Sequence, residues 1–411
     1  MGAVCPGAVV REASGDLLKV LHVIPSVAAR DGGPSRAVVE MCRALGAHGV
    51  ETLIASTDAD GLGRLDVKTG ELVSYEKVRA IFFARQWSEA FKYSRPLAQW
   101  LQAHVADFDV VHIHAIFSHA CLAAAAACRK QGVPYVVRPL GTLDPWSMKQ
   151  KPWRKVMFWR LAGKHMLEAA AAVHYTARAE QAAVEESLGL NHGKVIPLGV
   201  ESDLSALTSG NSAVAEKLPQ LGGHPYVLVL SRLHPKKGLD VFVDAFMSLT
   251  EQKEFGDWRL VLAGEGPDEY VQMLKRKVRD HGAEDIVLFP GWLEGNQKSA
   301  VLRGASLLAL PSYQENFGLC VIESLAAGVP VLVSPHVNLA DEIAAAGAGW
   351  VSPVEAMSLQ QTLMSALHDK DELSRRGALG RVFAQRFAWP NVAEMLAQLY
   401  ESVKRVATRN A

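Results

Sequence analysis

The stretch Pro311-Ser-Tyr-Gln-Glu-Asn-Phe-Gly-Leu-Cys-Val-Ile-Glu323 decides the fold, because a polar loop in it leads directly into a helix. The short apolar run 305–310 that precedes it is typical of a buried parallel strand. Helical spacing then continues to Gly328-Val-Pro330, where a glycine and a following proline end a helix. The sequence therefore predicts a strand, a loop and a helix, and in a doubly wound sheet such a loop lies at the edge where ligands bind.

This loop and helix carry two carboxylates, Glu315 and Glu323, one on either side of a helix start near Phe317 and Gly318. The free N–H groups at a helix start bind anions such as phosphates. A carboxylate cannot neutralise a phosphate, but it can accept hydrogen bonds from sugar hydroxyls on either side of one. The stretch therefore predicts a site for a phosphorylated sugar. A solvated loop glutamate and a glutamate on a helix face remain the alternative.

Length and composition indicate a globular enzyme of two domains. The chain has 411 residues, of which 49% are apolar and 21% are charged. Its 43 basic and 43 acidic residues cancel, which argues against a nucleic-acid binder. The 5 cysteines are scattered and never form a C-x2-C pair, so we expect reduced thiols in the cytoplasm and no zinc site. We expect no transmembrane helix and no signal peptide, and interpret residues 1–16 as a leader.

Strands and helices alternate from Leu17 to Val200, which predicts a mainly parallel sheet with helices on both faces. The first strand, 17–24, is followed by the turn Asp31-Gly-Gly-Pro-Ser35 and a helix. Gly32 and Gly33 allow the backbone to approach a ligand closely, although a plain turn is the alternative. Further strands are expected at 51–56, 79–83, 108–114, 134–138, 171–175 and 194–197.

The strand 108–114 ends with His112-Ile-His114. Alternate residues of a strand share one face, so both imidazoles point the same way and His114 reaches the carboxyl edge of the sheet. His114 is therefore a candidate for ligand contact, and a structural histidine is the alternative. We do not expect a metal here, because no third ligand is evident nearby. Two short acidic patterns typical of metal-dependent sugar transferases, Asp58-Ala-Asp60 and Asp107-Phe-Asp109, are interpreted as turn and strand-start residues.

Basic and aromatic side chains alternate in the segment 147–165, which has no acidic residue. Lys149, Lys151, Arg154 and Lys155 lie close to Trp153 in the sequence. Basic residues combined with tryptophan suit an anionic membrane surface. The segment therefore predicts a peripheral membrane contact, and a solvated helix face with its aromatic residues in the core is the alternative.

The alternation restarts after a polar connection at 202–224. A strand at 226–231 leads into Arg232-Leu-His-Pro-Lys-Lys-Gly238, which places Arg232 and Lys237 on another loop at the ligand edge. Two cations there can neutralise a departing diphosphate, although ordinary surface charges are the alternative. Later strands are expected at 258–263, 286–292, 329–334 and 349–351.

Three further features of the second half complete the pattern. Gly264-Glu-Gly-Pro267 is a weak glycine signal after a strand, and the exposed backbone of Phe289-Pro-Gly291 is suited to reading the edge of a base. The last helix, from Pro390 to about Arg405, has one apolar stripe formed by Val392, Leu396, Leu399 and Val403.

Taken together, these residues resemble the large family of retaining glycosyltransferases usually numbered four. The matching segments occur in the family's order and are Gly-Gly-Pro-Ser-Arg36, His-Ile-His114, Ile-Pro-Leu-Gly-Val200, Ser-Arg-Leu-His-Pro-Lys-Lys-Gly238, Ala-Gly-Glu-Gly-Pro267, Phe-Pro-Gly-Trp292 and Glu-x7-Glu323. The resemblance covers nearly the whole chain from Leu17. It implies the GT-B architecture, in which two Rossmann-like, doubly wound α/β domains face each other across a cleft. We expect an acceptor-side domain at 17–200, a donor domain at 201–386 and a helix at 387–411 that crosses back to the first domain.

The resemblance also implies roles for individual residues around a nucleotide-diphosphate sugar. The diphosphate would be held by Arg232 and Lys237, together with the amides of Asn316, Phe317 and Gly318. On the sugar side, Glu315 and His114 would contact the transferred sugar, and Glu323 would bind the ribose. The remaining donor-binding positions are Gly32, Gly33, Gly264, Phe289, Pro290 and Gly291.

The implied reaction is retaining transfer of a hexose to a saccharide or lipid-linked acceptor in bacterial-type polysaccharide or glycolipid synthesis. The resemblance implies no metal and no other cofactor, and a place in the cytoplasm or at the inner face of the membrane. Pro139-Leu-Gly-Thr-Leu-Asp-Pro-Trp146 resembles the acceptor-side loop of members that build such polymers, with Leu140 where many have a basic residue. The donor base and the sugar stay open. The alternatives are a nucleotide-sugar hydrolase, an epimerase or a sugar-phosphate synthase on the same fold, or a binding scaffold without catalysis.

Overall fold

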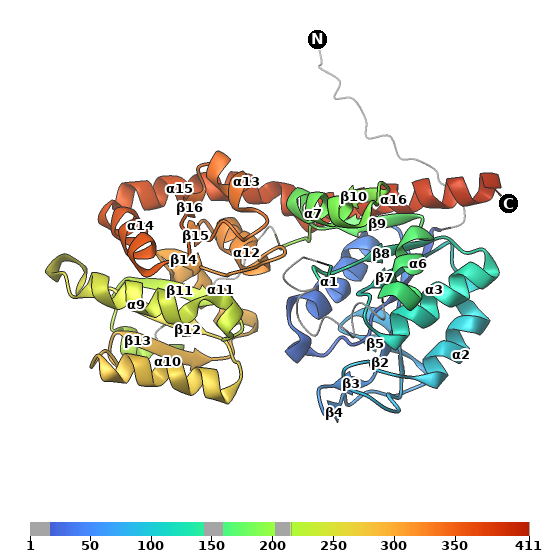
Figure 1. Ribbon diagram of the computed structural model, residues 1–411, viewed down its shortest axis with the longest axis horizontal. Helices are drawn as coiled ribbons and strands as arrows, with labels where there is room; N and C mark the ends of the chain where they lie inside the picture. The colour runs from blue at the N-terminus through green and yellow to red at the C-terminus, as the bar shows by residue number, and fades with distance from the viewer. Residues whose placement is uncertain (1–16, 144–158, 202–213, 215, 411) are drawn as a thin grey trace, which may run out of the picture.

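The computed structural model describes residues 17–143, 159–201, 214 and 216–410 (Figure 1). Within these residues the chain forms two lobes, each built on its own main sheet. The strand order is β10-β9-β8-β7-β1-β2-β6-β5 in the first sheet and β13-β12-β11-β14-β15-β16 in the second. The predicted α/β class with two Rossmann-like parallel sheets is confirmed.

The first sheet is parallel except for one edge strand, as its apolar strands predict. Its parallel strands are β1 (Lys19–Val23), β2 (Glu51–Thr57), β6 (Val78–Phe83), β7 (Val110–His114), β8 (Tyr135–Arg138), β9 (Ala172–Tyr175) and β10 (Gly193–Val195). The helices around it are α1 (Gly33–Ala47), α2 (Arg95–His104), α3 (His119–Gln131), α6 (Lys164–Glu168) and α7 (Arg178–Leu188).

The segment between β2 and β6 contains structure that the sequence did not predict. β5 (Leu72–Tyr75) pairs antiparallel with β6, and β3 (Ala59–Asp60) and β4 (Gly63–Arg64) form a small hairpin. These strands are short, and their burial does not follow a long apolar run. Hydrophobic periodicity therefore gives no signal for them.

The second sheet is entirely parallel and has helices on both faces. Its strands are β11 (Tyr226–Leu230), β12 (Arg259–Ala263), β13 (Val287–Gly291), β14 (Leu307–Leu310), β15 (Val331–Val333) and β16 (Gly349–Val351). The helices of this lobe are α9 (Leu239–Thr250), α10 (Asp268–Asp280), α11 (Gly295–Gly304), α12 (Leu319–Ala327), α13 (Ala340–Ala345), α14 (Ala356–His368) and α15 (Lys370–Ala384). The carboxyl ends of its strands lead into the loops that carry the candidate site residues.

The last helix, α16 (Trp389–Asn410), leaves the second lobe and lies along the first (Figure 1). Its predicted apolar stripe is buried against a cluster that includes Val20, Met41 and Val110 of the first lobe. The helix runs five residues further than the expected end at Arg405, because these residues do not continue the apolar stripe and Val406 among them is exposed. This packing supports the inference that the chain crosses back to the first domain.

The two lobes also share a buried apolar cluster. It contains Ala37 and Ala177 of the first lobe together with Phe317 and Val321 of the second. This shared cluster brings the start of α12 close to the first lobe. We infer that the chain divides near residues 200 and 386, with the helix from 387 onward belonging structurally to the first domain.

Within residues 17–143, 159–201 and 216–410, no helix combines the length and the apolar character needed to cross a bilayer.

Candidate functional site

The start of α12 is built as the sequence predicts. Gly318 caps the helix with φ of 72°, and Gly328 ends it with φ of 81°, both in the left-handed region that favours glycine. The preceding loop is fixed by its backbone, because Glu315 N–H donates to the His336 carbonyl and Asn338 N–H donates to the Glu315 carbonyl. The helix start and its first carboxylate are therefore held rigidly at the edge of the second sheet.

Lys237 and Glu315, both predicted as site residues, form an ion pair in the structure. Both side chains are largely buried, and they come from the loops after β11 and β14. Burial by itself raises the pKa of the Glu315 carboxyl. The positive charges of Lys237, Lys236 and Arg232 lower this pKa by more than burial raises it, so the pKa lies below its usual value. Glu315 is therefore held as a carboxylate, and Arg232 belongs to the same charge cluster.

Glu323 has its own cationic partner, Lys298 of α11, with Nζ 2.7 Å from Oε1. The charge of Glu323 also acts on Arg36 of α1, in the other lobe. For Arg36, burial lowers the pKa, but Glu40 first and then Glu323 raise it, and the pKa lies above its usual value. The two lobes therefore face each other here, with a carboxylate of one near a cation of the other.

Lys298 is the site residue that the sequence did not reveal. It lies inside an ordinary amphipathic helix, and no motif marks it. Its bond to Glu323 uses one carboxylate oxygen, and a carboxylate offers about four lone-pair sites on two oxygens. Glu323 can therefore hold Lys298 and still accept a hydrogen bond from a hydroxyl group.

The glycines that were expected to line the diphosphate side lie at the start of α1. Gly32 has φ of 81° and precedes the first helical residue, Gly33. A Cβ atom added at either position would meet no atom of the described residues within 4 Å. The described residues therefore leave space next to these glycines, and the contact of Gly32 and Gly33 with a diphosphate stays a prediction.

Gly264 has a structural reason to be glycine. Its φ is 138°, and a Cβ atom there would collide with the Ser231 carbonyl oxygen at the end of β11. Its N–H donates to the Gly291 carbonyl over 2.8 Å. Gly264 thus connects the ends of β11, β12 and β13 at the ligand edge, and its contact with a donor stays a prediction.

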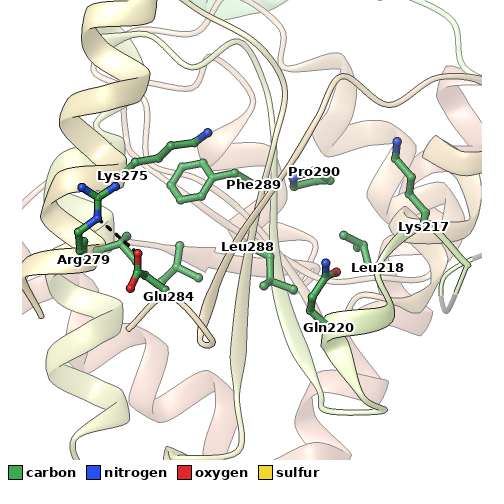
Figure 2. A pocket seen from close by; sticks show the side chains of 11 residues that line it. Lys217, Leu218, Gln220, Lys275, Arg279, Glu284, Leu288, Phe289 and Pro290 are labelled. Atoms are coloured by element: carbon green, nitrogen blue, oxygen red, sulfur yellow. Dashed lines mark hydrogen bonds and ion pairs between the residues drawn. The ribbon is translucent and has the colours of Figure 1, made fainter. Parts of the chain in front are cut away.

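Phe289 and Pro290 of the edge strand β13 line a pocket of about 360 Å³ (Figure 2). Three cations, Lys217, Lys275 and Arg279, line the same pocket, and the Nζ atom of Lys275 lies 5.7 Å from the centre of the Phe289 ring. Arg279 is paired with a carboxylate of the same pocket. The predicted contact of Phe289, Pro290 and Gly291 with a base stays a prediction.

His114 ends β7 at the carboxyl edge, as expected, but its side chain is 0% exposed. Its Nε2 lies 3.0 Å from Nδ1 of His22 on the adjacent strand β1, and the two rings stack. In this structure His114 therefore presents no atom to the space between the lobes. The predicted contact with the transferred sugar requires the side chains that enclose it to move, and it stays a prediction.

The expectation that no third ligand lies near His112 and His114 is wrong. Parallel pairing of β1 with β7 places His22 opposite His112, and ligand atoms of the three imidazoles lie within 4.8 Å of one another. The three histidines meet because β1 lies next to β7, and this strand order cannot be deduced from the sequence pattern. The fully buried guanidinium of Arg138 lies in the same cluster, and after burial its charge contributes to the lowered pKa of His22. That positive charge opposes a divalent cation, so we assign no metal here.

A hydrogen-bond chain connects this cluster to α16. The Tyr400 hydroxyl lies 2.7 Å from His112 Nδ1, His112 Nε2 lies 3.3 Å from His174 Nδ1, and His174 Nε2 lies 2.7 Å from the Ile196 carbonyl. Burial lowers the pKa of both imidazoles, so both rings are neutral. Because a carbonyl can only accept, the neutral His174 carries its proton on Nε2 and accepts on Nδ1 from His112, whose Nδ1 accepts from the Tyr400 hydroxyl. The last helix is thereby bonded to the centre of the first sheet.

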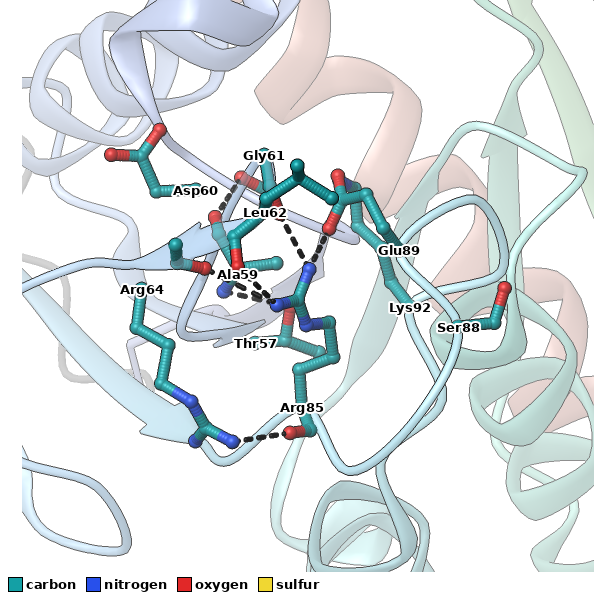
Figure 3. Close-up of polar contacts among 12 residues, drawn as sticks. Thr57, Ala59, Asp60, Gly61, Leu62, Arg64, Arg85, Ser88, Glu89 and Lys92 are labelled. Carbon is teal, nitrogen blue, oxygen red and sulfur yellow. Dashed lines mark hydrogen bonds and ion pairs between the residues drawn. The ribbon is translucent and has the colours of Figure 1, made fainter.

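The two short acidic patterns have structural partners, as interpreted from the sequence. The Asp58 carboxylate accepts from Arg85 N–H at 2.7 Å and from Arg64 at 2.8 Å. The Arg85 guanidinium in turn donates to the carbonyls of Gly61 and Leu62 and so closes the hairpin loop (Figure 3). In the second pattern, Asp109 accepts from the Lys19 backbone and pairs with a lysine of α16.

Most of the basic segment 147–165, from residue 147 to residue 158, lies outside the described residues. Its end is helical, with Trp159–Gly163 followed by α6, in which Met166 and Leu167 are buried. The membrane contact stays a prediction.

Comparison with known proteins gives two family matches, one on each lobe. Residues 32–199 match the glycosyl transferase 4-like domain, and residues 213–381 match the glycosyl transferases group 1 family. A phosphatidyl-myo-inositol mannosyltransferase from Mycobacterium leprae is 28% identical over 72% of this chain and 74% of its own length. Mannosylfructose-phosphate synthase from Agrobacterium fabrum is 32% identical, but that match spans 43% of this chain and only 40% of the relative.

Solved structures agree in fold. Sucrose-phosphate synthase from Thermosynechococcus elongatus has a TM-score of 0.75 at 19% identity, covering 95% of this chain and 100% of that chain. HepE from Anabaena, solved with UDP and glucose, has a TM-score of 0.73 at 20% identity, covering 94% and 100%. One family match occupies each lobe, the second match includes the paired acids and cations of the site, and the chain belongs to family four of the glycosyltransferases, which has the GT-B fold.

Proposed function

We propose that this protein transfers a hexose from a nucleotide-diphosphate sugar to a saccharide or lipid-linked acceptor, with retention of the anomeric configuration and without a bound metal. The Lys237–Glu315 pair at the start of α12 carries the proposal. A cation, a carboxylate and free helix amides at one point suit a phosphate joined to a sugar. The alternatives on the same fold, a hydrolase, an epimerase or a sugar-phosphate synthase, would use the same donor subsite.

The cationic side of the site would stabilise the leaving group. As the bond between the sugar C1 and the diphosphate breaks, negative charge grows on the departing phosphate. Lys237, Arg232 and the amides of Asn316, Phe317 and Gly318 would bind that charge, and such preorganised donors act most strongly where charge develops. The acceptor oxygen would bond to C1 from the same face, and its proton would pass to the departing phosphate oxygen.

The acidic side of the site would orient the donor. Glu315, held ionised by its cationic neighbours, would accept hydrogen bonds from hydroxyls of the transferred sugar. Glu323 would accept from the ribose hydroxyls with the lone pairs that Lys298 leaves unused. Binding at both ends would fix C1 between the diphosphate and the acceptor, and fixing the reacting atoms in this way lowers the barrier.

The acceptor is proposed from relatives, whose names include a phospholipid mannosyltransferase and a sugar-phosphate synthase. The neutral loop residue Leu140 stands where many polymer-building members have a basic residue, so we assign no charged group to the acceptor there. We place the protein in the cytoplasm, with segment 147–165 contacting an anionic membrane. Co-sedimentation with anionic but not zwitterionic vesicles tests that contact.

Product analysis tests the proposed function. The protein is incubated with UDP- and GDP-hexoses, with and without lipid-linked or soluble saccharide acceptors. We expect nucleoside diphosphate release that depends on the acceptor, and nuclear magnetic resonance of the product should show the anomeric configuration of the donor. Equal release without any acceptor would identify a hydrolase instead, and donor binding without release under any condition would identify a scaffold.

Replacing Glu323 with glutamine is expected to weaken donor binding more than it slows transfer. The amide keeps one acceptor oxygen but loses the charge-assisted bonds to Lys298 and the ribose, which are worth about 1.5–3 kcal/mol each. We therefore expect KM for the donor to rise at least about tenfold, with kcat changed less. Glu355→Gln, at the start of α14, is the matched control, and its KM should equal that of the wild type.

A further inference from the structure

A polar contact joins the two lobes directly beside the predicted catalytic carboxylate. Asn316, the neighbour of Glu315, belongs to the second lobe, and its Nδ2 donates to Oγ1 of Thr176 in the first lobe over 3.0 Å. Asn338 Nδ2 lies 3.3 Å from the Asn316 Oδ1 and can donate to it. Asn338 of the same lobe thus orients the Asn316 amide, and the amide in turn contacts Thr176 of the first lobe.

A buried carboxylate lies beneath this contact in the first lobe. Glu180 of α7 is 4% exposed, and its Oε2 accepts from both the N–H and the hydroxyl of Thr176, at 2.8 and 2.9 Å. A carboxylate can only accept, so the Thr176 hydroxyl proton points toward Glu180 and its lone pairs remain for Asn316. Glu180 therefore determines which way Thr176 faces, and chains of this kind strengthen each bond in them.

The same carboxylate holds the loop that resembles the acceptor-side loop of related enzymes. Its Oε1 accepts from Gly141 N–H at 3.0 Å. Leu140 and Gly141 have φ of 60° and 66°, and a left-handed conformation at leucine is strained and persists only where the surroundings impose it. The Asn316 side chain packs on Gly141, because a Cβ atom there would lie 2.8 Å from Asn316 Cγ.

We propose that Glu180 is a positioning residue for glycosyl transfer: it builds a seat from Thr176 and Gly141 into which Asn316 of the donor loop docks. The seat sets the distance between the acceptor-side loop and Glu315. Glu180 touches neither substrate in this scheme and acts only through Asn316. The catalytic part of the inference rests on the proposed function, whereas the docking part rests on the described contacts alone.

An alternative explanation for the buried Glu180 is that it only stabilises the first lobe. A buried carboxylate with three hydrogen bonds contributes to folding whatever faces it. Burial keeps the pKa of Glu180 above the usual value, although hydrogen bonding by Thr176, Gly141 and the Asn316 side chain lowers it. The stabilising role and the positioning role of Glu180 predict different changes in measurable properties. Only the seat couples Glu180 to Asn316 across the lobes and to the rate of transfer.

Kinetics of Glu180→Gln and Thr176→Val test the inference. Glutamine places an amide where Thr176 needs an acceptor, and valine keeps the shape of threonine without its hydroxyl. We expect kcat to fall about 10- to 100-fold, as a misplacement near 1 Å does, while nucleoside diphosphate affinity by calorimetry changes less than about twofold. Thr176→Ser, which retains the hydroxyl, should restore kcat. The double variant Thr176→Val/Asn316→Ala should lose no more than the worse single variant.

A matched pair of glycines isolates the steric part of the seat. Gly141→Ala and Gly132→Ala both force alanine into a left-handed conformation, with φ of 66° and 71°. Only the alanine at 141 meets Asn316, since a Cβ atom at 132 has no described atom within 4 Å. We expect both to lower the melting temperature and only Gly141→Ala to lower kcat.

Small-angle X-ray scattering gives a readout that needs no substrate. We expect Glu180→Gln and Thr176→Val to increase the radius of gyration relative to the wild type, because the lobes lose their polar contact. Lower melting temperatures with unchanged scattering and unchanged kcat would overturn the inference and leave the proposed function standing. If the wild type transfers no sugar but the variants still expand, the seat stands and the proposed function fails.

Discussion

Lys237→Ala is expected to lower kcat for glycosyl transfer by about 100- to 1,000-fold, the cost of removing one donor from a site where negative charge develops. The lysine lies on the loop after β11 and is paired with Glu315 at the start of α12. Its loss removes a cation from the departing diphosphate and also leaves Glu315 largely buried without its main partner. The effect should therefore exceed that of removing Arg232, which is exposed.

Steady-state kinetics with a donor and acceptor pair measure this effect, and Lys277→Ala is the matched control. Lys277 also forms an ion pair within the second lobe, at 2.6 Å from Asp244, but its partner lies on α9 rather than in the donor loop. It should retain wild-type kcat. Lys237→Arg should recover part of the rate because the charge returns with a different shape. A Lys237→Ala protein that folds normally and retains more than about a tenth of wild-type kcat would contradict the leaving-group role.

The lysine at 237 and the carboxylate at 315 illustrate what sequence reasoning predicts well. Each lies just after a short apolar strand, and in a parallel sheet the loops after neighbouring strands meet at one edge. β11 and β14 are adjacent in the second sheet, so two loops far apart in the chain deliver their charges to one point. The pattern of strands and helices predicts that both loops lie at this edge, and the adjacency of β11 and β14 then brings the two side chains together.

Contacts that depend on strand order or on the arrangement of the lobes could not be predicted in this way. His22 became a neighbour of His114 only because β1 and β7 pair, and no periodicity reports that pairing. Lys298 lies on a helix that could have faced several directions. Thr176 and Asn316 meet across the lobes, at a place that neither half of the sequence encodes alone. The contacts of these residues become visible only in the three-dimensional structure.

Acidification from pH 7 to pH 5 is expected to destabilise the first lobe strongly, because it buries four neutral histidines. Burial lowers the pKa of His22 and His174 to about 3, and lowers those of His112 and His114 well below their usual value. Unfolded histidine has a pKa of about 6.5. Below that pH the unfolded chain takes up protons that the folded chain refuses, so stability is complete above 6.5 and falls toward pH 3.

The size of this loss follows from the number of protons. Each histidine contributes about 1.4 kcal/mol per pH unit once its unfolded form is fully protonated, so four contribute about 5 kcal/mol per unit. This approaches the whole stability of a typical domain, about 5–15 kcal/mol. Glu180 acts in the opposite direction, since its pKa is raised and the folded state takes up its proton first, but it offsets at most one proton.

Urea unfolding at a series of pH values, followed by circular dichroism, measures the slope. His22→Phe removes one titrating ring and should reduce the slope between pH 6 and pH 5 by about 1.4 kcal/mol per unit, whatever it does to stability at pH 7. A wild-type slope that matches a single proton would mean that these rings are protonated in the folded state, and the neutral chain from Tyr400 to Ile196 would then be wrong.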